Sequence, residues 1–414
     1  MSVNHGISNS GFSVFHYKLK DAPTCQTQIF VRAGSAHEDD DSLGVAHFLE
    51  HLCFQGTPTK DKHQMSREMS LAGNANAYTN NFVTSYYIET LKEDIETGFS
   101  LIKEAVFDSC FPEKEFEKEK NVIIEEWRMY DNYPSEYFHD KVMTNSFGEK
   151  DMHAIIGTED SIRQMNPEKL HRFRNKWYGK NNMSIVFVGD LEFEEAMEIA
   201  NKHLPEYSSS EESFSCLNEF LPKQEKFLFE TDRFEQSAYG LITKWPSSKE
   251  NHQNNLIGNF FSFCLSNYMY EYIRDDLGLC YGVSSSKIKH LDNSYNLISM
   301  LTRNDYLEKA EKELEKLFQK IKEEGFPKQI FEISKKKILF SQMKTLADVG
   351  SICYAIIAGC FTDKDGSWFL EKGQSTLNPD WVKKSAEMLT EGSLKKFANE
   401  QLNDFTKFSM FSKK

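Results

Sequence analysis

Two histidines and a glutamate stand close together in the stretch 47–51 (HFLEH). In an α-helix, positions i, i+3 and i+4 share one face, so His47, Glu50 and His51 would project together. Neutral imidazoles suit Zn²⁺, and a carboxylate beside the metal can take the proton of a water molecule. A helix that merely carries two histidines and a surface acid has the same pattern, so a third ligand is needed to support a zinc site.

The acidic stretch 112–127 (PEKEFEKEKNVIIEEW) offers this third ligand, because catalytic zinc usually has three protein ligands and one open position. With helical spacing, Glu119 and Glu126 fall on a stripe that is otherwise apolar and includes Val122, Ile123 and Tyr130. A buried carboxylate without a partner is costly, and a metal or a ligand histidine would satisfy it. We therefore predict Glu126 as a zinc ligand and Glu119 as the partner of a ligand histidine.

Glu125 is the alternative to Glu126 in this stretch. It belongs to a more polar stripe with Lys118 and Asn121, which favours a position in solvent. A solvated acidic face also explains most of the other acids between residues 112 and 127.

The segments around these residues have the patterns of helices and short strands. Helices are predicted over 43–54, 62–71, 92–107, 112–130, 256–276, 306–324 and 329–346. Strand-like alternation occurs at 12–17, 26–32, 183–188, 226–229, 237–242 and 407–411. Because helices and strands do not alternate regularly, an α+β fold is favoured over a doubly wound parallel sheet.

The chain of 414 residues is too long for one ordinary domain core. The small, polar stretch 207–215 (YSSSEESFS) lies near its midpoint. The two halves end alike, because 165–173 (MNPEKLHRF) aligns without gaps on 389–397 (LTEGSLKKF), and a strand-like run follows each. We predict two tandem homologous domains, each a mixed, largely antiparallel sheet flanked by helices: 1–206, which carries the zinc site, and 217–414, joined by a linker over 207–216.

Composition narrows the function classes. A net charge of −14 argues against a general nucleic-acid binder, which needs a basic surface to displace counterions from phosphates. No apolar run approaches the about 18–20 residues that span a bilayer, and residues 1–22 lack the pattern of a secretory or transit peptide. The eight cysteines are scattered without a CxxC pair, which favours reduced thiols. We expect a cytoplasmic protein that binds neither nucleic acid nor a membrane.

The stretch 44–57 (GVAHFLEHLCFQGT) resembles the zinc helix of the pitrilysin, insulin-degrading enzyme and mitochondrial-processing-peptidase family. This family carries HxxEH, the inverse of the HExxH order of other zinc proteases. The family's motif continues with a glutamate some 75 residues later, preceded seven positions earlier by another essential glutamate. Glu126 lies 75 residues after His51, and Glu119 lies seven residues before Glu126. The stretch 178–190 (YGKNNMSIVFVGD) also matches the family's domain-closing strand.

The resemblance also implies substrate-binding residues. The stretch 73–79 (GNANAYT) resembles the edge strand on which the family pairs the substrate backbone, so Asn76 and Ala77 are expected to touch the peptide. In the second half, 272–282 (YIRDDLGLCYG) resembles an element whose Arg and Tyr grip the substrate beside the scissile bond. Arg274 and Tyr281 have the same spacing of seven residues. An Arg and a phenol are suitable donors to a carbonyl that becomes an oxyanion.

The expected protein is a zinc metalloendopeptidase that cleaves unfolded peptides or leader segments of precursors. His47, His51 and Glu126 would hold Zn²⁺, with Glu50 as general base and Glu119 as the second essential glutamate. Large single-chain members of the family have four such domains, and this chain has length for two. The resemblance to short bacterial-type members therefore implies a homodimeric chamber with an active site shared between chains, or pairing with a different related chain.

Two other functions fit parts of the sequence. Some relatives of the family are catalytically silent scaffold or regulatory subunits, but these typically lack part of the zinc set, and all four zinc-site groups are present here. A zinc-buffering protein would not need Arg274 or Tyr281. Metal content and a broad peptide-cleavage assay separate the three possibilities.

Overall fold

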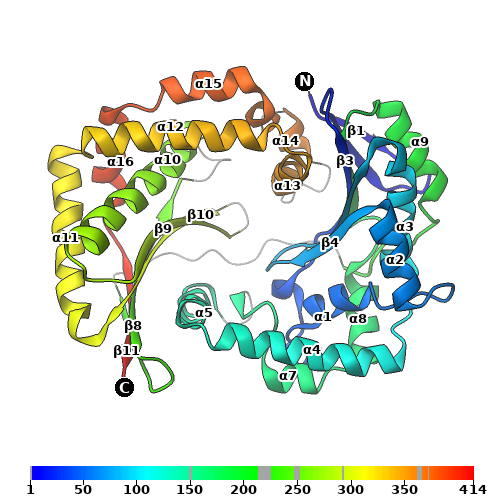
Figure 1. Cartoon of the computed structure of the whole chain (residues 1–414), viewed down its shortest axis with the longest axis horizontal. Coiled ribbons are helices and arrows are strands. Elements are labelled where there is room, and N and C mark those ends of the chain that lie inside the picture. The colour runs from blue at the N-terminus through cyan, green and yellow to red at the C-terminus, as the bar shows by residue number, and fades with distance from the viewer. Residues whose placement is uncertain are drawn as a thin grey trace. The chain divides into compact units, whose positions relative to one another are not determined.

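The computed structural model describes residues 2–148, 152–212, 225–246, 252–290, 293–360, 366–371 and 373–414. The chain divides into two compact units, each with one sheet and flanking helices (Figure 1). Unit 1 comprises Met1–Met129, Gly148–Cys216 and Lys344–Pro379, and unit 2 comprises Tyr130–Phe147, Leu217–Met343 and Asp380–Lys414. Both units are α+β, as predicted.

The sheet of unit 1 has six strands in the order β1-β2-β6-β3-β5-β4. These are β1 (Asn4–Ile7), β2 (Ser13–Lys18), β3 (Thr24–Val31), β4 (Gly73–Thr79), β5 (Thr84–Leu91) and β6 (Met183–Gly189). The pairing of β2 with β6 is parallel, and the other pairings are antiparallel. Strand β4 lies at an edge and pairs with β5 alone within the described residues, so its other side is open.

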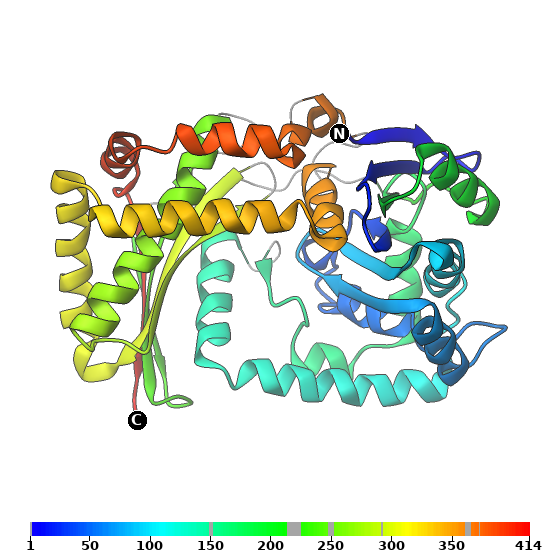
Figure 2. The same cartoon turned by 45° about the horizontal axis from the view of Figure 1, so that its top comes forward.

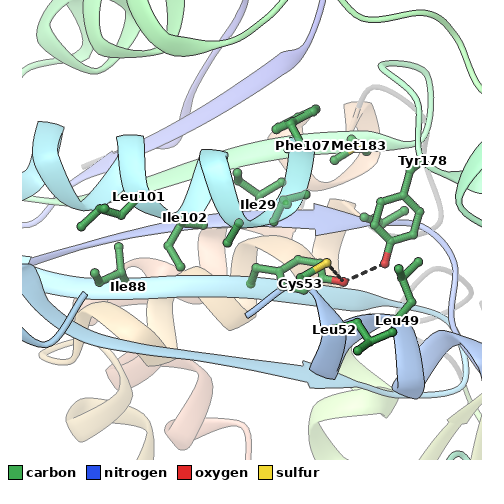
Figure 3. Packing of buried hydrophobic residues seen from close by; sticks show 14 of the residues in the cluster. Ile29, Leu49, Leu52, Cys53, Ile88, Leu101, Ile102, Phe107, Tyr178 and Met183 are labelled. Carbon is green, nitrogen blue, oxygen red and sulfur yellow. Dashed lines mark hydrogen bonds between the residues drawn. The ribbon is translucent and has the colours of Figure 1, made fainter. Parts of the chain in front are cut away.

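Helices cover both faces of this sheet. The helices of unit 1 are α1 (Val45–Leu52), α2 (Lys62–Ala72), α3 (Ile95–Phe107), α4 (Glu113–Asp131), α7 (Glu159–Arg163), α8 (Pro167–Trp177), α9 (Phe193–His203), α13 (Val349–Cys360) and α14 (Ser367–Glu371), with short 3₁₀ turns η1 (Ser35–His37), η2 (Lys92–Asp94) and η5 (Gly373–Leu377). The apolar faces of α1 and α3 pack on the sheet, where Leu49 and Ile102 lie in one core with Ile29 and Ile88 (Figure 3).

Three hydrogen-bonded polar groups lie within this core, next to the end of α1. The Cys53 thiol donates to the hydroxyl of Tyr86 at 3.5 Å, and that hydroxyl lies 2.8 Å from the hydroxyl of Tyr178 (Figure 3). Buried polar groups are tolerated when they bond one another. These bonds therefore connect the end of α1 to the sheet and to the chain after α8.

The sheet of unit 2 has five strands in the order β7-β11-β8-β10-β9. The strands are β7 (Lys226–Thr231), β8 (Gln236–Trp245), β9 (Gly282–His290), β10 (Asn293–Arg303) and β11 (Thr406–Ser412). Its helices are α5 (Pro134–Phe147), α10 (His252–Met269), the π-helical η3 (Tyr270–Asp276), η4 (Asn304–Tyr306), α11 (Leu307–Glu324), α12 (Lys328–Thr345), α15 (Pro379–Glu387) and α16 (Glu391–Gln401). Strands β7, β11, β8, β10 and β9 repeat the order of β2, β6, β3, β5 and β4, including one parallel pairing.

The repeat predicted from the ends of the two halves is visible at the helix caps. Asn166 begins α8 by accepting the N–H of Lys169 at 3.0 Å, and Thr390 begins α16 by accepting the N–H of Ser393 at 3.1 Å. Such N-cap residues satisfy backbone donors that lack a partner in the helix. Because Thr390 lies 224 residues after Asn166, the caps align at the predicted offset.

The contacts divide the chain differently from the predicted continuous domains 1–206 and 217–414, because each half of the sequence contributes a helix to the other sheet. Helix α5 packs in unit 2, where the ring of Phe147 meets that of Tyr295 edge-on at 5.0 Å. Helix α13 packs in unit 1 against β3 and β6 (Figure 2). The position of a helix in the sequence does not determine which sheet it covers. No local sequence pattern therefore predicts that α5 packs in unit 2 and α13 in unit 1.

The first part of the predicted linker is packed against unit 1. Ser210 is buried, and its backbone N–H donates to Oδ1 of Asn181 at 2.7 Å. Residues 213–216 of the predicted linker lie outside the described residues.

Within the described ranges, no single helix has the length and apolar composition to cross a membrane. Helices α12 and α13 meet that criterion only when taken together, and they are bent by 95°.

Candidate metal centre

Helix α1 presents its polar residues on one side and its apolar residues to the core. Helix α1 lies beside α4 (Figure 1). The rings of His47 and His51 face Glu126 and Glu119 of α4, and Glu50 falls on the same side of α1, whereas Leu49 is fully buried in the core. The helix begins after Gly44, whose φ is 87°. A Cβ atom at Gly44 would lie 2.4 Å from the carbonyl oxygen of Ile156, so both the backbone angle and the available space require glycine.

Helix α4 brings Glu126 to the two imidazoles. Nε2 of His47 lies 3.8 Å from Oε1 of Glu126, and Nε2 of His51 lies 3.5 Å from Oε2. One ligand atom from each of these residues lies within 4.8 Å of the others. A tetrahedral zinc ion with bonds of about 2.0–2.1 Å separates its ligand atoms by about 3.3–3.4 Å. The two nitrogens and the carboxylate therefore fit around one such ion after small side-chain movements.

Glu119 orients one of the two imidazoles. Nδ1 of His51 donates to Oε1 of Glu119 at 2.8 Å, which leaves the lone pair of Nε2 directed away from Glu119. The Glu119 carboxylate is buried, and its other oxygen lies 3.6 Å from Nζ of Lys62. Glu125, in contrast, is exposed and accepts from Arg128 at 2.7 Å.

The buried face of α4 is narrower than the predicted stripe. Glu119 and Ile123 are buried, and Glu126 is half-buried, but Val122 and Tyr130 are exposed. Successive residues of a helix are about 100° apart around its axis, so side chains beside the narrow strip that contacts α1 point into solvent. The prediction that Val122 and Tyr130 share a buried stripe with the two acids is therefore wrong, although Glu119 and Glu126 both face α1.

Glu50 lies beside the edge strand. The hydroxyl of Thr79, the last residue of β4, donates to its Oε2 at 2.6 Å. Burial raises the pKa of Glu50, and the hydrogen bond from Thr79 acts against this rise. A carboxylate whose pKa is moved toward neutrality is suited to accept a proton and later return it.

The two histidines differ in their electrostatics. Burial lowers the pKa of His47 to about 3, and the nearby His51 acts in the same direction, so the His47 ring is neutral. Burial also lowers the pKa of His51, but the hydrogen bond to Glu119 and the neighbouring carboxylates outweigh it, and the net direction is upward. Because a metal binds the neutral ring, protons compete with it mainly at His51.

A buried acid that the sequence did not single out holds the start of α1. The carboxylate of Glu38 accepts the backbone N–H of Gly44 at 2.6 Å and that of Ala46 at 2.8 Å. Nε2 of His153 lies 2.7 Å from the same carboxylate. An acid at a helix N-terminus satisfies free N–H groups and opposes the positive end of the helix dipole. In the sequence, Glu38 stands among Asp39, Asp40 and Asp41, where it has the pattern of a surface acid.

Thr79 was also not predicted as a site residue, although it ends the stretch that contains Asn76 and Ala77. Both of these predicted substrate contacts lie on β4, three and two residues before Thr79. The backbone N–H of Ala77 donates to Oδ1 of Asn76 at 2.8 Å, so the neighbouring side chain occupies this donor. Asn76 is exposed, whereas Ala77 packs against the core.

Arg274 and Tyr281 lie together in unit 2. Nε of Arg274, on η3, donates to the carbonyl oxygen of Tyr281 at 3.0 Å. The guanidinium carbon lies 4.4 Å from the ring centroid of Tyr270 and the guanidinium bonds its hydroxyl. The Tyr281 side chain is 59% exposed. The structure brings this pair together, and its role toward the residues of unit 1 stays a prediction.

Comparisons with known proteins cover both halves of the chain. Residues 14–159 match the family model Insulinase (Peptidase family M16), and residues 164–338 match the model Peptidase M16 inactive domain. An uncharacterized zinc protease of Rickettsia bellii is 26% identical over 335 residues, which cover 78% of this chain and 81% of that protein. The uncharacterized zinc protease YmxG of Bacillus subtilis is 25% identical over 350 residues, which cover 80% and 82%. Cytochrome b-c1 complex subunit 1, mitochondrial, of Bos taurus is 26% identical over 183 residues, covering 44% and 38%.

Solved structures show the same fold. A protease from Helicobacter pylori superposes with a TM-score of 0.84 at 20% identity, covering 99% of both chains. The periplasmic protease PqqL from Escherichia coli superposes with a TM-score of 0.74 at 18% identity, covering 99% of this chain and 47% of that one.

Proposed function

Because this chain belongs to the insulinase family of M16 peptidases, we propose that it is a zinc-dependent endopeptidase that cleaves unfolded peptides or leader segments of precursors. One observation carries the proposal. Two imidazoles and a carboxylate, from His47, His51 and Glu126, converge from two helices at spacings that suit one metal ion, and Glu50 shares the face of α1 that carries both imidazoles. A protein of this family with only a structural role would not need all four of these side chains.

The proposed reaction uses each of these groups. His47, His51 and Glu126 would hold a zinc ion, which would supply a Lewis acid for the scissile carbonyl and for the attacking water. Glu50 takes the proton of the attacking water and passes it to the leaving amine. Thr79 engages Oε2 of Glu50, which leaves Oε1 for this proton.

Substrate would bind along the open side of β4. Backbone hydrogen bonds at Asn76 and Ala77 would add the peptide as a further strand, after the Asn76 side chain releases the N–H of Ala77. This mode requires an extended segment, because a folded substrate has its backbone groups already paired. Arg274 and Tyr281 would donate to the carbonyl oxygen as it becomes an oxyanion.

We further propose that the chain works as a homodimer in which Arg274 and Tyr281 of one subunit serve the zinc ligands of the other. The superposition with PqqL covers 47% of the PqqL chain. The PqqL chain is therefore long enough for four units, twice the number in this chain. A twofold pair of identical chains reaches the same number of units, and twofold symmetry is the commonest arrangement of homo-oligomers.

A catalytically silent scaffold is the second candidate. The similarity to a cytochrome b-c1 complex subunit favours it, as does the match of residues 164–338 to a domain described as inactive. The zinc-site groups argue against a scaffold, because burying imidazoles and carboxylates costs free energy and a purely structural role does not require it.

Metal analysis combined with cleavage of an unfolded polypeptide mixture tests the proposal. We expect about one zinc per chain and new peptide ends detectable by mass spectrometry. The matched variant Glu50→Gln should retain zinc and lose cleavage, because Glu50 moves the proton and does not bind the metal. Zinc without cleavage in the wild-type protein would favour the scaffold, and cleavage that survives in Glu50→Gln would contradict the mechanism.

A further inference from the structure

A cavity of about 430 Å³ lies in unit 1 on the face of the sheet opposite α1. This volume is within the range of about 300–1,000 Å³ that is common for ligand pockets. Alternate residues of β3, β5 and β4 line it, because side chains alternate between the two faces of a sheet. Gln26 of β3 and Asn74 of β4 both lie beside Glu89 of β5. The start of α13 closes the cavity on the other side.

The floor of the cavity is polar and ordered. Gln26 is 4% exposed and Gln28 is 2% exposed, although both are carboxamides. Nε2 of Gln26 donates to Oε1 of Gln28 at 3.2 Å, and Nε2 of Gln28 donates to Oγ of Ser85 at 2.6 Å. Burying such groups costs free energy, and these bonds hold them in fixed orientations beneath the cavity.

The walls of the cavity suit a cation. Glu89 and Asp348 both line it, and neither forms an ion pair with a basic residue in the described ranges. Oδ2 of Asp348 accepts the backbone N–H of Ser351 at 2.7 Å at the start of α13. The rings of Tyr78 and Tyr354 lie 6.3 Å apart and offer faces to an alkyl chain or a guanidinium. An ammonium or guanidinium group would be paired by the carboxylates and carboxamides.

The register of β4 connects this cavity to the candidate metal centre. Ala77 and Thr79 point to the face of α1, whereas Asn74, Asn76 and Tyr78 point to the cavity. A peptide added to the open edge would alternate in the same way, with every second side chain toward the cavity. Asn76 and Asn74 stand three and five positions before Thr79, which is about 10–17 Å along a strand.

We propose that this cavity receives a lysine or arginine side chain of a peptide strand paired with β4, three to five positions from the scissile bond. The inference rests on the proposed peptidase function and adds the substrate class to it. Specificity would come from one basic residue held at a distance from the cleaved bond, and not from the residues on either side of that bond.

Peptides of one fixed sequence, with a single lysine moved along it or replaced by norleucine, test the inference. We expect kcat/KM to be on the order of tenfold higher when lysine occupies the register that reaches the cavity. In Glu89→Gln this lysine-to-norleucine ratio should fall close to one. Asp348→Asn, which keeps a side chain able to begin α13, should lower the ratio as well. Glu194→Gln, an exposed acid on α9, is the matched control and should leave the ratio at its wild-type value.

The outcomes separate this inference from the function on which it rests. If peptides are cut equally well wherever the lysine stands, the cavity is not a specificity pocket, and the peptidase function is unaffected. If no peptide is cut and the Glu50→Gln variant binds none in fluorescence anisotropy, the proposed function fails and the inference fails with it. A ratio that falls equally in Glu89→Gln and Glu194→Gln would show that general charge, and not the cavity, selects the substrate.

Discussion

Nδ1 of His51 lies 2.8 Å from Oε1 of Glu119, and this bond joins α1 to α4. It assigns the proton of the ring to Nδ1 and leaves Nε2 free toward Glu126. Nδ1 of His47, in contrast, is buried without a hydrogen-bond partner in the described part of the chain. The two candidate ligand histidines are therefore oriented differently, one by a carboxylate and one by packing.

Removing the carboxylate of Glu119 should weaken zinc binding without removing a ligand. We expect Glu119→Gln to lower zinc affinity by about 10–100-fold, because His51 loses a charged partner that fixes its tautomer. Competition with a zinc chelator measures this change. Lys62→Gln removes only the more distant neighbour of Glu119 and should change affinity much less. Equal affinities in wild type and Glu119→Gln would contradict the orienting role.

Glu126 and Glu125 form a matched pair for the ligand assignment. Glu126→Gln should lose most of the zinc, because a carboxamide is a poor substitute for a carboxylate ligand. Glu125→Gln should retain it, since that side chain is exposed and pairs with Arg128. Zinc content of the two purified variants decides the question. A Glu126→Gln protein with zinc near the wild-type level would remove Glu126 from the ligand set.

Thr79→Val should change the pH dependence of cleavage. The hydroxyl of Thr79 donates to the Glu50 carboxylate and so favours its charged form, which holds the pKa below the value that burial alone would produce. Without this bond the pKa of Glu50 rises. A base must be deprotonated to act, so the acid limb of kcat/KM should move to higher pH. The measurement is a pH profile, and an unchanged acid limb would argue against Glu50 as the base.

Glu38→Ala should destabilise unit 1. The substitution removes the buried carboxylate that accepts the N–H groups of Gly44 and Ala46 and that lies 2.7 Å from Nε2 of His153. We expect the free energy of unfolding to fall by about 2–4 kcal/mol, measured by urea denaturation. Asp40→Ala, at an exposed neighbour, is the control and should have little effect. Equal losses in both variants would contradict the capping role.

Mixing two inactive variants tests the shared active site. In a dimer of His47→Ala with Arg274→Ala, one site would have intact zinc ligands from one chain and intact Arg274 from the other. The second site would carry both lesions. Co-expressed chains should therefore regain up to about half of the wild-type activity per mixed dimer. If mixed dimers form and stay as inactive as the parents, each chain completes its own site.

Much of the fold follows from local patterns. The spacing of His47, Glu50 and His51 places them on one face of any helix that forms there. The spacing of seven positions from Glu119 to Glu126 does the same on α4. The predicted helices and strands are present with ends shifted by a few residues. Helix caps and apolar periodicity act over one or two turns, so they are readable without knowledge of the rest of the chain.

Other features depend on which surfaces meet. Nothing near Glu38 in the sequence distinguishes it from Asp39 or Asp40, yet it is buried under α1, because the chain before that helix folds back onto its start. Likewise, Thr79 reaches Glu50 only because β4 lies beside α1. Such contacts join residues distant in sequence, and no local periodicity encodes them.

The sequence by itself determined the residue types of the candidate metal centre and their placement on two helical faces, because both depend on the geometry of single helices. The tertiary structure decided how α1 and α4 meet, that α5 and α13 each cover the sheet of the other half, and that a polar cavity lies behind the edge strand. These arrangements come from the burial of apolar faces between distant segments, and that burial is a property of the folded chain as a whole.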